Sequence, residues 1–415
     1  MPAPTSSGRV DGRDPDLNTQ DPRPNVQGPT PNTQHQRLTL SSVLGLYIHV
    51  PFCAAICNYC NFNRGLFDAG LKDRYVAALL AELERAADGS PVDTVYFGGG
   101  TPSLLDPGEI AAIIERCARS WALASDSEIT LEANPETVTS ERLAGFRASG
   151  VNRLSVGVQS FRDEELGRLS RLHSAARATE AFHMARTAGF SNISLDLMMG
   201  LPQQNEAEWL ESVEALIDLG PEHASLYLLE IYPNAPLREA MAIGHWSVTP
   251  EDEAAGMYLS GLDRMDRAGY VQYEISNLAR RGRESRHNLK YWTDGEWLGF
   301  GCGAHSTRND ARWRNLASTE EYVSAVAAGR SAAIDRRTLS AEARLEEALF
   351  MGLRLSAGLD VRAVHTRYGV DVWARYGAEL HPFVDQGILH YDGRALGLTR
   401  TGMLVAHEVM TVFIR

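Results

Sequence analysis

Three of the five cysteines lie close together in this 415-residue chain, at Cys53, Cys57 and Cys60. Thiolates at C-x3-C-x2-C spacing can hold a metal ion or an iron–sulfur cluster. A structural zinc site almost always has four protein ligands, and no fourth Cys or His follows at finger-like spacing. A [4Fe–4S] cluster that only carries electrons is bound by four sulfurs, so three leave one iron open to a small molecule. We therefore predict a cluster with an open iron; the alternatives are incidental buried cysteines and a zinc ion whose ligands are completed from far away.

A short apolar run at residues 46–50 ends just before the first of these cysteines. The run predicts a strand, which puts the cysteines in the loop after it, where barrel folds commonly build their sites. From residue 46 to about 230, further short apolar or β-branched runs alternate with amphipathic stretches. We expect strands at 46–50, 93–97, 128–132, 152–157, 192–197 and 223–229, and helices near 69–87, 108–121, 139–148, 174–188 and 205–219. This alternation predicts an α/β fold whose parallel strands curl into an open, partial (β/α)6 barrel.

Polar residues follow these strands where such a barrel would use them, at the carboxyl ends. The second strand runs into a glycine turn at residues 98–100, whose missing side chains let a ligand touch backbone amides. A glycine run alone is more often a turn than a site, and one polar residue at a strand end is often only a cap. Four successive strands end this way, at Thr101, Glu132, Gln159 and Asp196. The repetition favours a ligand site over capping.

The rest of the chain divides by composition. Residues 1–40 contain seven of the 18 prolines and no aromatic residue, so we expect a disordered tail. The barrel is expected over 41–230. Residues 231–340, with a helix near 251–268, are interpreted as an extension that completes the open side of the barrel. Residues 341–415 predict a small α+β accessory domain, because helices are followed by a hairpin with an Asp-Gly turn, which resembles a winged helix.

Charge and composition limit the partners. The chain has 40 basic and 53 acidic residues, a net charge of −13, and no basic run, so nucleic-acid or anionic-membrane binding has little electrostatic support. No stretch approaches the roughly 20 apolar residues of a spanning helix, and the N-terminus has no apolar signal core. We expect no integral membrane segment and a cytoplasmic location, which an odd number of clustered cysteines also fits. Small molecules or proteins are the expected partners.

A second group of residues could bind a metalloporphyrin. His287 begins the segment His-Asn-Leu-Lys-Tyr-Trp. Neutral imidazole is a common axial ligand of heme iron, and the neighbouring aromatic rings offer a flat apolar contact. Taken alone, a histidine beside aromatic residues is usually structural. His305, in a glycine-rich turn, is a weaker candidate whose alternative role is backbone packing, and Cys117 and Cys302 are interpreted as ordinary buried thiols.

The cysteine motif, with Tyr59 immediately before its last cysteine, resembles the radical S-adenosylmethionine (SAM) superfamily. The resemblance implies that the open iron is chelated by the amino and carboxylate groups of SAM, and that an electron from the cluster cleaves its sulfonium. It also implies that the glycine turn binds the methionine amino group and that Glu132 meets the ribose or methionine part. The implied cofactor contacts are Tyr47, Tyr59, Gly99, Gly100, Thr101 and Glu132, with Gln159, Arg171 and Asp196 lining a deeper cavity.

Several segments match one branch of that superfamily, the oxygen-independent coproporphyrinogen III oxidase-like group. They are Tyr-Ile-His-Val-Pro-Phe-Cys, Phe-Gly-Gly-Gly-Thr-Pro-Ser, Glu-Ala-Asn-Pro, Arg-Leu-Ser-Val-Gly-Val-Gln-Ser-Phe and Asp-Leu-Met-Met-Gly-Leu-Pro. The dehydrogenase of this group carries a further cysteine two residues after the third ligand, and Phe62 stands there in this chain. The ending with phenylalanine, and the His287 segment, are similar to the HemW family of heme chaperones.

The resemblance therefore implies a heme chaperone that binds a [4Fe–4S] cluster, SAM and heme, with His287 contacting heme, and that transfers heme to an unidentified acceptor protein. The alternative is the oxidative decarboxylation of coproporphyrinogen III to protoporphyrinogen IX by an adenosyl radical. A third interpretation, from another class, is a zinc-stabilised interaction protein on the same scaffold. The sequence identifies neither the acceptor nor the oligomeric state, and a homodimer stays open.

Overall fold

The computed structural model describes residues 43–414, so the expected disordered tail at 1–40 lies outside the described residues. All six expected strands are present. They are β1 (Leu44–Val50), β4 (Pro91–Gly99), β5 (Ala122–Ala133), β6 (Arg153–Gln159), β7 (Ile193–Met199) and β8 (His223–Leu228). They pair in parallel in the order β1-β4-β5-β6-β7-β8. The α/β prediction is confirmed.

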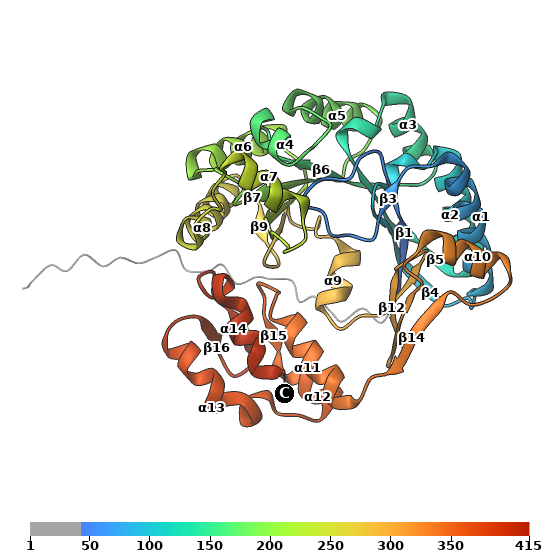
Figure 1. Ribbon diagram of the computed structural model, residues 1–415. Helices are drawn as coiled ribbons and strands as arrows, with labels where there is room; N and C mark the ends of the chain where they lie inside the picture. The colour runs from blue at the N-terminus through green and yellow to red at the C-terminus, as the bar shows by residue number, and fades with distance from the viewer. Residues whose placement is uncertain (1–42, 415) are drawn as a thin grey trace, which may run out of the picture. The chain divides into compact units, whose positions relative to one another are not determined.

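Helices follow these strands and surround the sheet (Figure 1). They are α1 (Ala69–Arg85), α2 (Pro107–Ser120), α3 (Ser140–Ala148), α4 (Asp163–Arg168), α5 (Ala175–Thr187) and α6 (Glu206–Leu219). Side-chain caps define where several of them begin: Asp68 accepts a hydrogen bond from the Leu71 amide, and Asn205 forms a capping box with Glu208. Each cap satisfies amides that the first helical turn leaves without a partner.

The two faces of the strands differ in chemistry. Successive strand residues point to opposite faces, so Leu46, Ile48 and Val50 pack beneath the helices and are fully buried. The other face lies inside the curved sheet, and its side chains are polar and bonded to one another across strands. They include Tyr47, His49, Thr94, Tyr96, Glu132, Ser155, Ser194, Asp196 and His223. A polar interior of this kind is suited to hold a polar ligand.

Residues 231–340 add strands to both edges of this sheet. Next to β8 lie β10 (Asn277–Ala279) and β9 (Val271–Gln272); next to β1 lie β11 (Trp297–Phe300), β12 (His305–Arg308), β13 (Ala311–Asn315) and β14 (Ala333–Thr338). Over residues 43–414 the terminal strands β9 and β14 of this 12-stranded sheet do not pair with each other. The extension thus lengthens the sheet and leaves it open, whereas the sequence predicted that it would complete the barrel.

The same region contributes helices α7 (Pro236–Gly244), α8 (Glu251–Arg267), α9 (Arg286–Trp292) and α10 (Thr319–Ala327). Helix α9 carries the His287 segment and lies against the inner face of β4, where Lys290 pairs with Asp93 at 2.6 Å (Figure 1). Its first two amides donate to the Glu128 carboxylate, both at 3.1 Å. These contacts fix the His287 segment inside the sheet.

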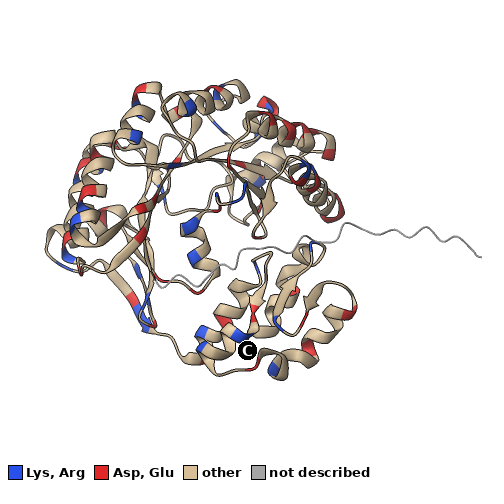
Figure 2. Ribbon diagram, turned by 180° about the vertical axis from the view of Figure 1, so that it is seen from behind, with Lys and Arg blue, Asp and Glu red and all other residues tan. Residues whose placement is uncertain are grey.

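The C-terminal part is α+β, as predicted. It consists of α11 (Ala341–Gly352), β15 (Leu359–Asp360), α12 (Val361–Tyr368), α13 (Val372–Asp385), β16 (Leu389–Tyr391), β17 (Ala395–Leu398) and α14 (Ala406–Met410), with a sheet in the order β15-β17-β16. The β16–β17 hairpin turns at Asp392 and Gly393. Acidic and basic residues are interspersed along the helices in Figure 2. No helix of the described residues combines the length and the apolar character needed to cross a membrane.

Candidate functional site

The three clustered cysteines occupy the loop that follows β1, as the sequence predicted. Cys53 belongs to β2 (Phe52–Cys53), which pairs with β3 (Gly65–Leu66), and is buried. Cys57 and Cys60 are half-buried on a turn in which the Cys60 amide donates to the Cys57 carbonyl at 3.2 Å. All three are free thiols. In the described part of the chain, no three Cys, His, Asp or Glu side chains converge closely enough to hold a single metal ion.

A hydrogen-bonded path joins two of these cysteines across the strand ends. Thr101 contacts the Cys53 sulfur at 3.7 Å and accepts from Asn134 at 3.1 Å. Arg171 donates to the other end of the Asn134 amide at 2.8 Å and reaches the Cys57 sulfur at 3.5 Å. Side chains from the ends of β4 and β5 and from the loop after α4 therefore fix the positions of Cys53 and Cys57 relative to each other.

Positive charge accompanies the thiols. The guanidinium of Arg171 lies against Cys57, and that of Arg64 donates to the Cys60 carbonyl. Burial raises the pKa of the Cys53 thiol, with the neighbouring Cys60 and Cys57 adding to the rise and Arg64 opposing it. Three thiolates and their cluster form an anion, which two nearby arginines would help to stabilise. The donor set and its charges fit a [4Fe–4S] cluster with three protein sulfurs.

The glycine turn at residues 98–100 packs against this loop. A side chain at Gly100 would come within 2.7 Å of the Phe52 carbonyl, and one at Gly99, where φ is +119°, within 2.6 Å of the His49 ring. The Gly99 amide donates to Glu132 at 3.2 Å and the Gly100 amide to the Val50 carbonyl at 2.8 Å. The glycines are thus required for close packing. The backbone amides of Gly99 and Gly100, which the sequence suggested for ligand binding, already donate to acceptors within the protein.

Two carboxylates lie in the polar interior behind the turn. Glu132 accepts from the Tyr96 hydroxyl at 2.7 Å, and burial raises the pKa of its carboxyl to about 7. Asp196 accepts from Ser155 and Ser194, and burial raises its pKa as well. A cation placed between the strand ends would stabilise the ionised form of each of these carboxyl groups.

Three further residues predicted for the site come from β6, the cysteine loop and β1. Gln159 ends β6 with φ of +70°, a strained conformation for a residue with a side chain. The Tyr59 side chain is half-buried near Arg171, and partial burial raises the pKa of its phenol. The Tyr47 ring lies stacked near Tyr96, with 6.2 Å between ring centroids. The structure therefore brings the residues predicted for the cluster and for SAM to one end of the sheet.

His287 lies in the same polar interior, with its ring centroid 5.1 Å from that of Tyr96 and 6.4 Å from that of Tyr47. It is 1% exposed, with Nδ1 at 2.8 Å from the Thr94 hydroxyl and Nε2 at 2.9 Å from the Tyr291 hydroxyl. Burial, aided by Lys290 and Arg153, lowers the pKa of this imidazole to about 3, so the ring is neutral. Both nitrogens are occupied, and iron ligation by His287 would require the ring to leave these partners.

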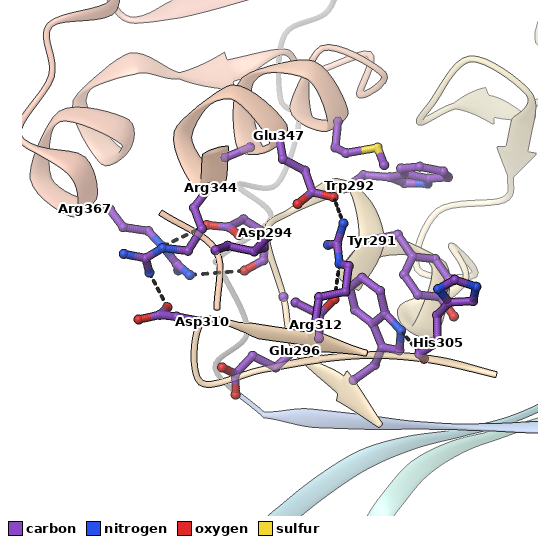
Figure 3. Close-up of a pocket in the computed structure, with 16 residues that line it drawn as sticks. Tyr291, Trp292, Asp294, Glu296, His305, Asp310, Arg312, Arg344, Glu347 and Arg367 are labelled. Carbon is purple, nitrogen blue, oxygen red and sulfur yellow. Dashed lines mark hydrogen bonds and ion pairs between the residues drawn. The ribbon is translucent and has the colours of Figure 1, made fainter. Parts of the chain in front are cut away.

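A pocket of about 280 Å³ opens beside α9, between β11–β13 and the C-terminal helices α11 and α12 (Figure 3). Tyr291 and Trp292 of the His287 segment line it, whereas His287 does not. The C-terminal part supplies Arg344, Glu347 and Arg367. The aromatic end of the segment therefore faces a cavity that its histidine does not reach.

Comparison with known proteins assigns the two parts of the chain. Residues 47–216 match the radical SAM superfamily, and residues 339–405 match the HemN C-terminal domain. The heme chaperone HemW of Bacillus subtilis is 36% identical over 372 residues, which cover 89% of this chain and 98% of that protein. This chain belongs to the HemW family. HemW of Escherichia coli is 41% identical over 267 residues, covering 63% of this chain and 69% of that protein.

A solved structure supports the same fold. Coproporphyrinogen III oxidase (HemN) of Escherichia coli, a radical SAM enzyme, superposes with a TM-score of 0.79 over 90% of both chains, at 23% identity. At that identity the likeness establishes the fold alone. Identification with HemW thus rests on the sequence comparisons, and the HemN structure confirms the radical SAM architecture.

Sequence reasoning did not select Arg64, Asn134 or Arg153 for the site. Asn134 lies two residues beyond Glu132, immediately after β5, and a polar residue directly after a strand was a readable signal. Arg153 begins β6 and is 1% exposed, although the residues that follow it as far as Val158 are buried and apolar or small. A lone arginine at an inward strand position could have been recognised as part of a polar interior. Arg64 carries no such signal.

Proposed function

We propose that this protein is a heme chaperone that holds a [4Fe–4S] cluster on Cys53, Cys57 and Cys60, binds SAM beside it, and passes heme to an acceptor protein. The observation that carries this proposal is the 36% identity over 98% of a relative named heme chaperone HemW. The chemistry of the donor set supports the cluster, since three free thiols with two arginines beside them suit an anionic group with one open iron.

The chain's own residues would orient the ligand and stabilise its charge. The bound cluster would supply electrons and a coordination position for SAM. Arg171 would hold Cys57 in place, and the Thr101–Asn134 contact would hold Cys53. Glu132 would meet the positively charged part of SAM. The acceptor is a protein whose identity stays open, and free clustered thiols fit a reducing compartment such as the cytoplasm.

The alternative function, radical decarboxylation of coproporphyrinogen III, has one observation in its favour. The polar interior resembles a chamber for a multiply charged substrate, with Arg153 buried among Glu132, Asp196 and His223. Against it stands Phe62, which occupies the position of the additional cysteine and is 64% exposed beside the cysteine loop. The chaperone is the better-supported function.

One sample can decide between these functions. After anaerobic reconstitution, the protein is titrated with heme and, in parallel, incubated with coproporphyrinogen III, SAM and a reductant. We expect heme to bind at about one per chain, because its iron offers a position for a protein ligand. Coproporphyrinogen III should remain unchanged, because Phe62 stands where the dehydrogenase carries its additional cysteine. Repeated release of carbon dioxide from coproporphyrinogen III would show that the chaperone assignment is wrong.

A pH dependence follows from Glu132. In the free protein its carboxyl is protonated below a pKa of about 7. Cationic SAM favours the ionised form and lowers that pKa in the complex, so binding below pH 7 must release a proton. SAM affinity is therefore expected to rise by up to about tenfold per pH unit towards pH 7 and then level off.

Binding calorimetry between pH 5.5 and 8.5 measures this effect. Glu132→Gln should weaken binding and flatten the profile, and any pH dependence left in this variant belongs to the ligand. Glu141→Gln, an exposed change on α3, is the matched control and should follow the wild-type profile. Equal profiles for the wild type and Glu132→Gln would exclude this role for Glu132.

A further inference from the structure

Cys60 differs from the other two clustered cysteines in how its sulfur is positioned. Neighbouring side chains contact the sulfurs of Cys53 and Cys57. No hydrogen bond from the described residues 43–414 reaches the Cys60 sulfur, although Arg64 donates to the carbonyl of this residue. The position of the third sulfur therefore depends on how the backbone after Cys60 is anchored.

Asn63, three residues after Cys60, provides such an anchor. Its side-chain amide donates to the carbonyl of Cys302 at 3.2 Å and to the carbonyl of Ala317 at 3.1 Å. Its own backbone carbonyl accepts from His49 Nε2 at 2.8 Å. The end of the cysteine loop is thus attached both to β1 and to a segment that lies 239 positions further along the chain.

The distant segment is a turn at residues 301–303 that leaves no room for a side chain at its two glycines. Gly301 and Gly303 have φ of +91° and +71°, a conformation that favours glycine. A Cβ on Gly303 would clash with the Asn63 amide. A Cβ on Gly301 would lie 2.8 Å from the His49 carbonyl oxygen. The 301–303 turn is therefore shaped to pack against Asn63 and the end of β1.

Helix α1 supplies the residues that hold this turn. Tyr75 and Glu82 are seven positions apart, which is about two turns, so they project from the same face of the helix. The Tyr75 hydroxyl donates to the His49 carbonyl at 2.7 Å and accepts from the Cys302 amide at 3.2 Å. The Glu82 carboxylate accepts from the Gly301 amide at 2.9 Å. One helix face therefore holds both the turn and the end of β1.

Glu82 also connects the turn to two further elements. It accepts from the Tyr322 hydroxyl of α10 at 2.6 Å and from the Asn315 amide of β13 at 2.7 Å. The Asn315 amide donates to the Gly301 carbonyl as well, at 2.9 Å. Burial raises the pKa of the Glu82 carboxyl, and the hydrogen bonds from these donors oppose the rise. Helices α1 and α10 pack against each other (Figure 1), so the turn has a rigid support.

We propose that Asn63 is a positioning residue for the cluster: bonded to the 301–303 turn, it holds Cys60 in place for its iron, and Glu82 holds the turn. The proposal rests on the proposed function, since it concerns the cluster that the three cysteines would bind. Two residues separate Asn63 from Cys60, so the sulfur cannot move far while the anchor holds. Partners that orient a metal ligand in this way also increase the affinity for the metal.

Release of iron to a ferrous chelator tests the anchor in the anaerobically reconstituted full-length protein. Asn63→Ala should release iron about tenfold faster than the wild type, because it removes both hydrogen bonds to the neighbouring carbonyls. It should also change the electron paramagnetic resonance spectrum of the reduced cluster, because the Cys60 sulfur is no longer held in one orientation. A loss of protein stability alone would leave the spectrum of the intact cluster unchanged.

Two variants are matched controls. Asn61→Ala changes an exposed asparagine of the same loop that does not bond to the 301–303 turn. Cys302→Ala keeps the backbone carbonyl to which Asn63 donates. Both variants should match the wild type in the rate of iron release and in the spectrum.

A double-variant cycle locates the effect in the contact between Asn63 and the turn. Gly303→Ala should release iron faster, because its methyl group would displace the Asn63 amide. In an Asn63→Ala background the same change should add little, because the group that it would displace is absent. Glu82→Gln should act in the same direction but more weakly, since one of its two acceptor oxygens is kept.

The outcomes separate this inference from the function itself. If the wild type assembles no cluster, the proposed function and the inference both fail. If the wild type assembles a cluster and Asn63→Ala keeps its rate of iron release and its spectrum, only the inference is wrong. Equally fast release from Asn61→Ala and Asn63→Ala with unchanged spectra would also overturn it, because any change in the loop would then suffice. Additive effects of Asn63→Ala and Gly303→Ala would show that the turn does not act through Asn63.

Discussion

Replacing any one of Cys53, Cys57 or Cys60 with alanine is expected to reduce the iron of the anaerobically reconstituted protein from about four atoms per chain to almost none. Three protein sulfurs already leave one iron without a protein ligand, so a second missing sulfur would leave too few bonds to keep the cluster. The loop also holds two arginines, Arg64 and Arg171, close to the sulfurs. Iron and sulfide analysis, together with the air-sensitive visible absorption, measures the loss.

The two remaining cysteines serve as controls. Cys117 is fully buried in α2, and burial raises the pKa of its thiol to about 12, so it is a poor metal ligand. Cys302 lies 3.8 Å from the Asn63 amide and 3.5 Å from the Thr319 hydroxyl. Cys117→Ala and Cys302→Ala should both take up the full amount of iron. Stoichiometric zinc without iron uptake, or full iron in Cys57→Ala, would contradict the cluster assignment.

Most of the parallel sheet could be predicted from the sequence. Strands with one face buried beneath helices need apolar or β-branched residues at alternate positions, and each of the six segments shows them. The edges could not be predicted in the same way. Strand β11 has four residues, too few for a clear alternation, and it pairs with β1 from far along the chain. Local pattern does not encode such pairing.

The candidate site, like the sheet, could be predicted from the sequence only in part. Motif spacing placed the cysteines, the glycine turn and Glu132 at one end of the sheet, because the carboxyl ends of parallel strands meet there. The environment of His287 was not readable, since its partner Thr94 lies 193 positions away. The pocket was equally hidden, because its lining combines α9, β12 and the C-terminal helix α11. Which histidine faces a cavity depends on tertiary packing alone.

The second large effect is expected where the C-terminal part meets the barrel, at Glu274. This carboxylate is fully buried and accepts from the Ser276 amide at 2.9 Å, from Asn277, and from Arg354 at 3.0 Å. Arg354 follows α11 and lies over the Trp292 ring, with 4.3 Å between its guanidinium carbon and the ring centroid. One arginine therefore connects the C-terminal part, the buried carboxylate and the wall of the pocket.

Arg354→Ala should lower the free energy of unfolding by about 3–5 kcal/mol, because it leaves a buried carboxylate without its counter-charge. The arginine is 26% exposed, so water can partly replace it and the lower end of this range is expected. The midpoint of urea denaturation measures the loss. Arg375→Ala removes a more exposed pair with Glu342 in the C-terminal part and should cost at most about 1 kcal/mol.

A double variant shows whether the unpaired charge is the cause. Glu274→Gln keeps the side chain's shape and removes its charge, so combining it with Arg354→Ala should restore part of the stability that Arg354→Ala loses. If the double variant is instead less stable by the sum of the two single changes, the pair is not coupled, and Arg354 stabilises the protein mainly through its contact with Trp292. That result would place the main effect of Arg354→Ala at the pocket lining around Trp292 and not at the buried carboxylate.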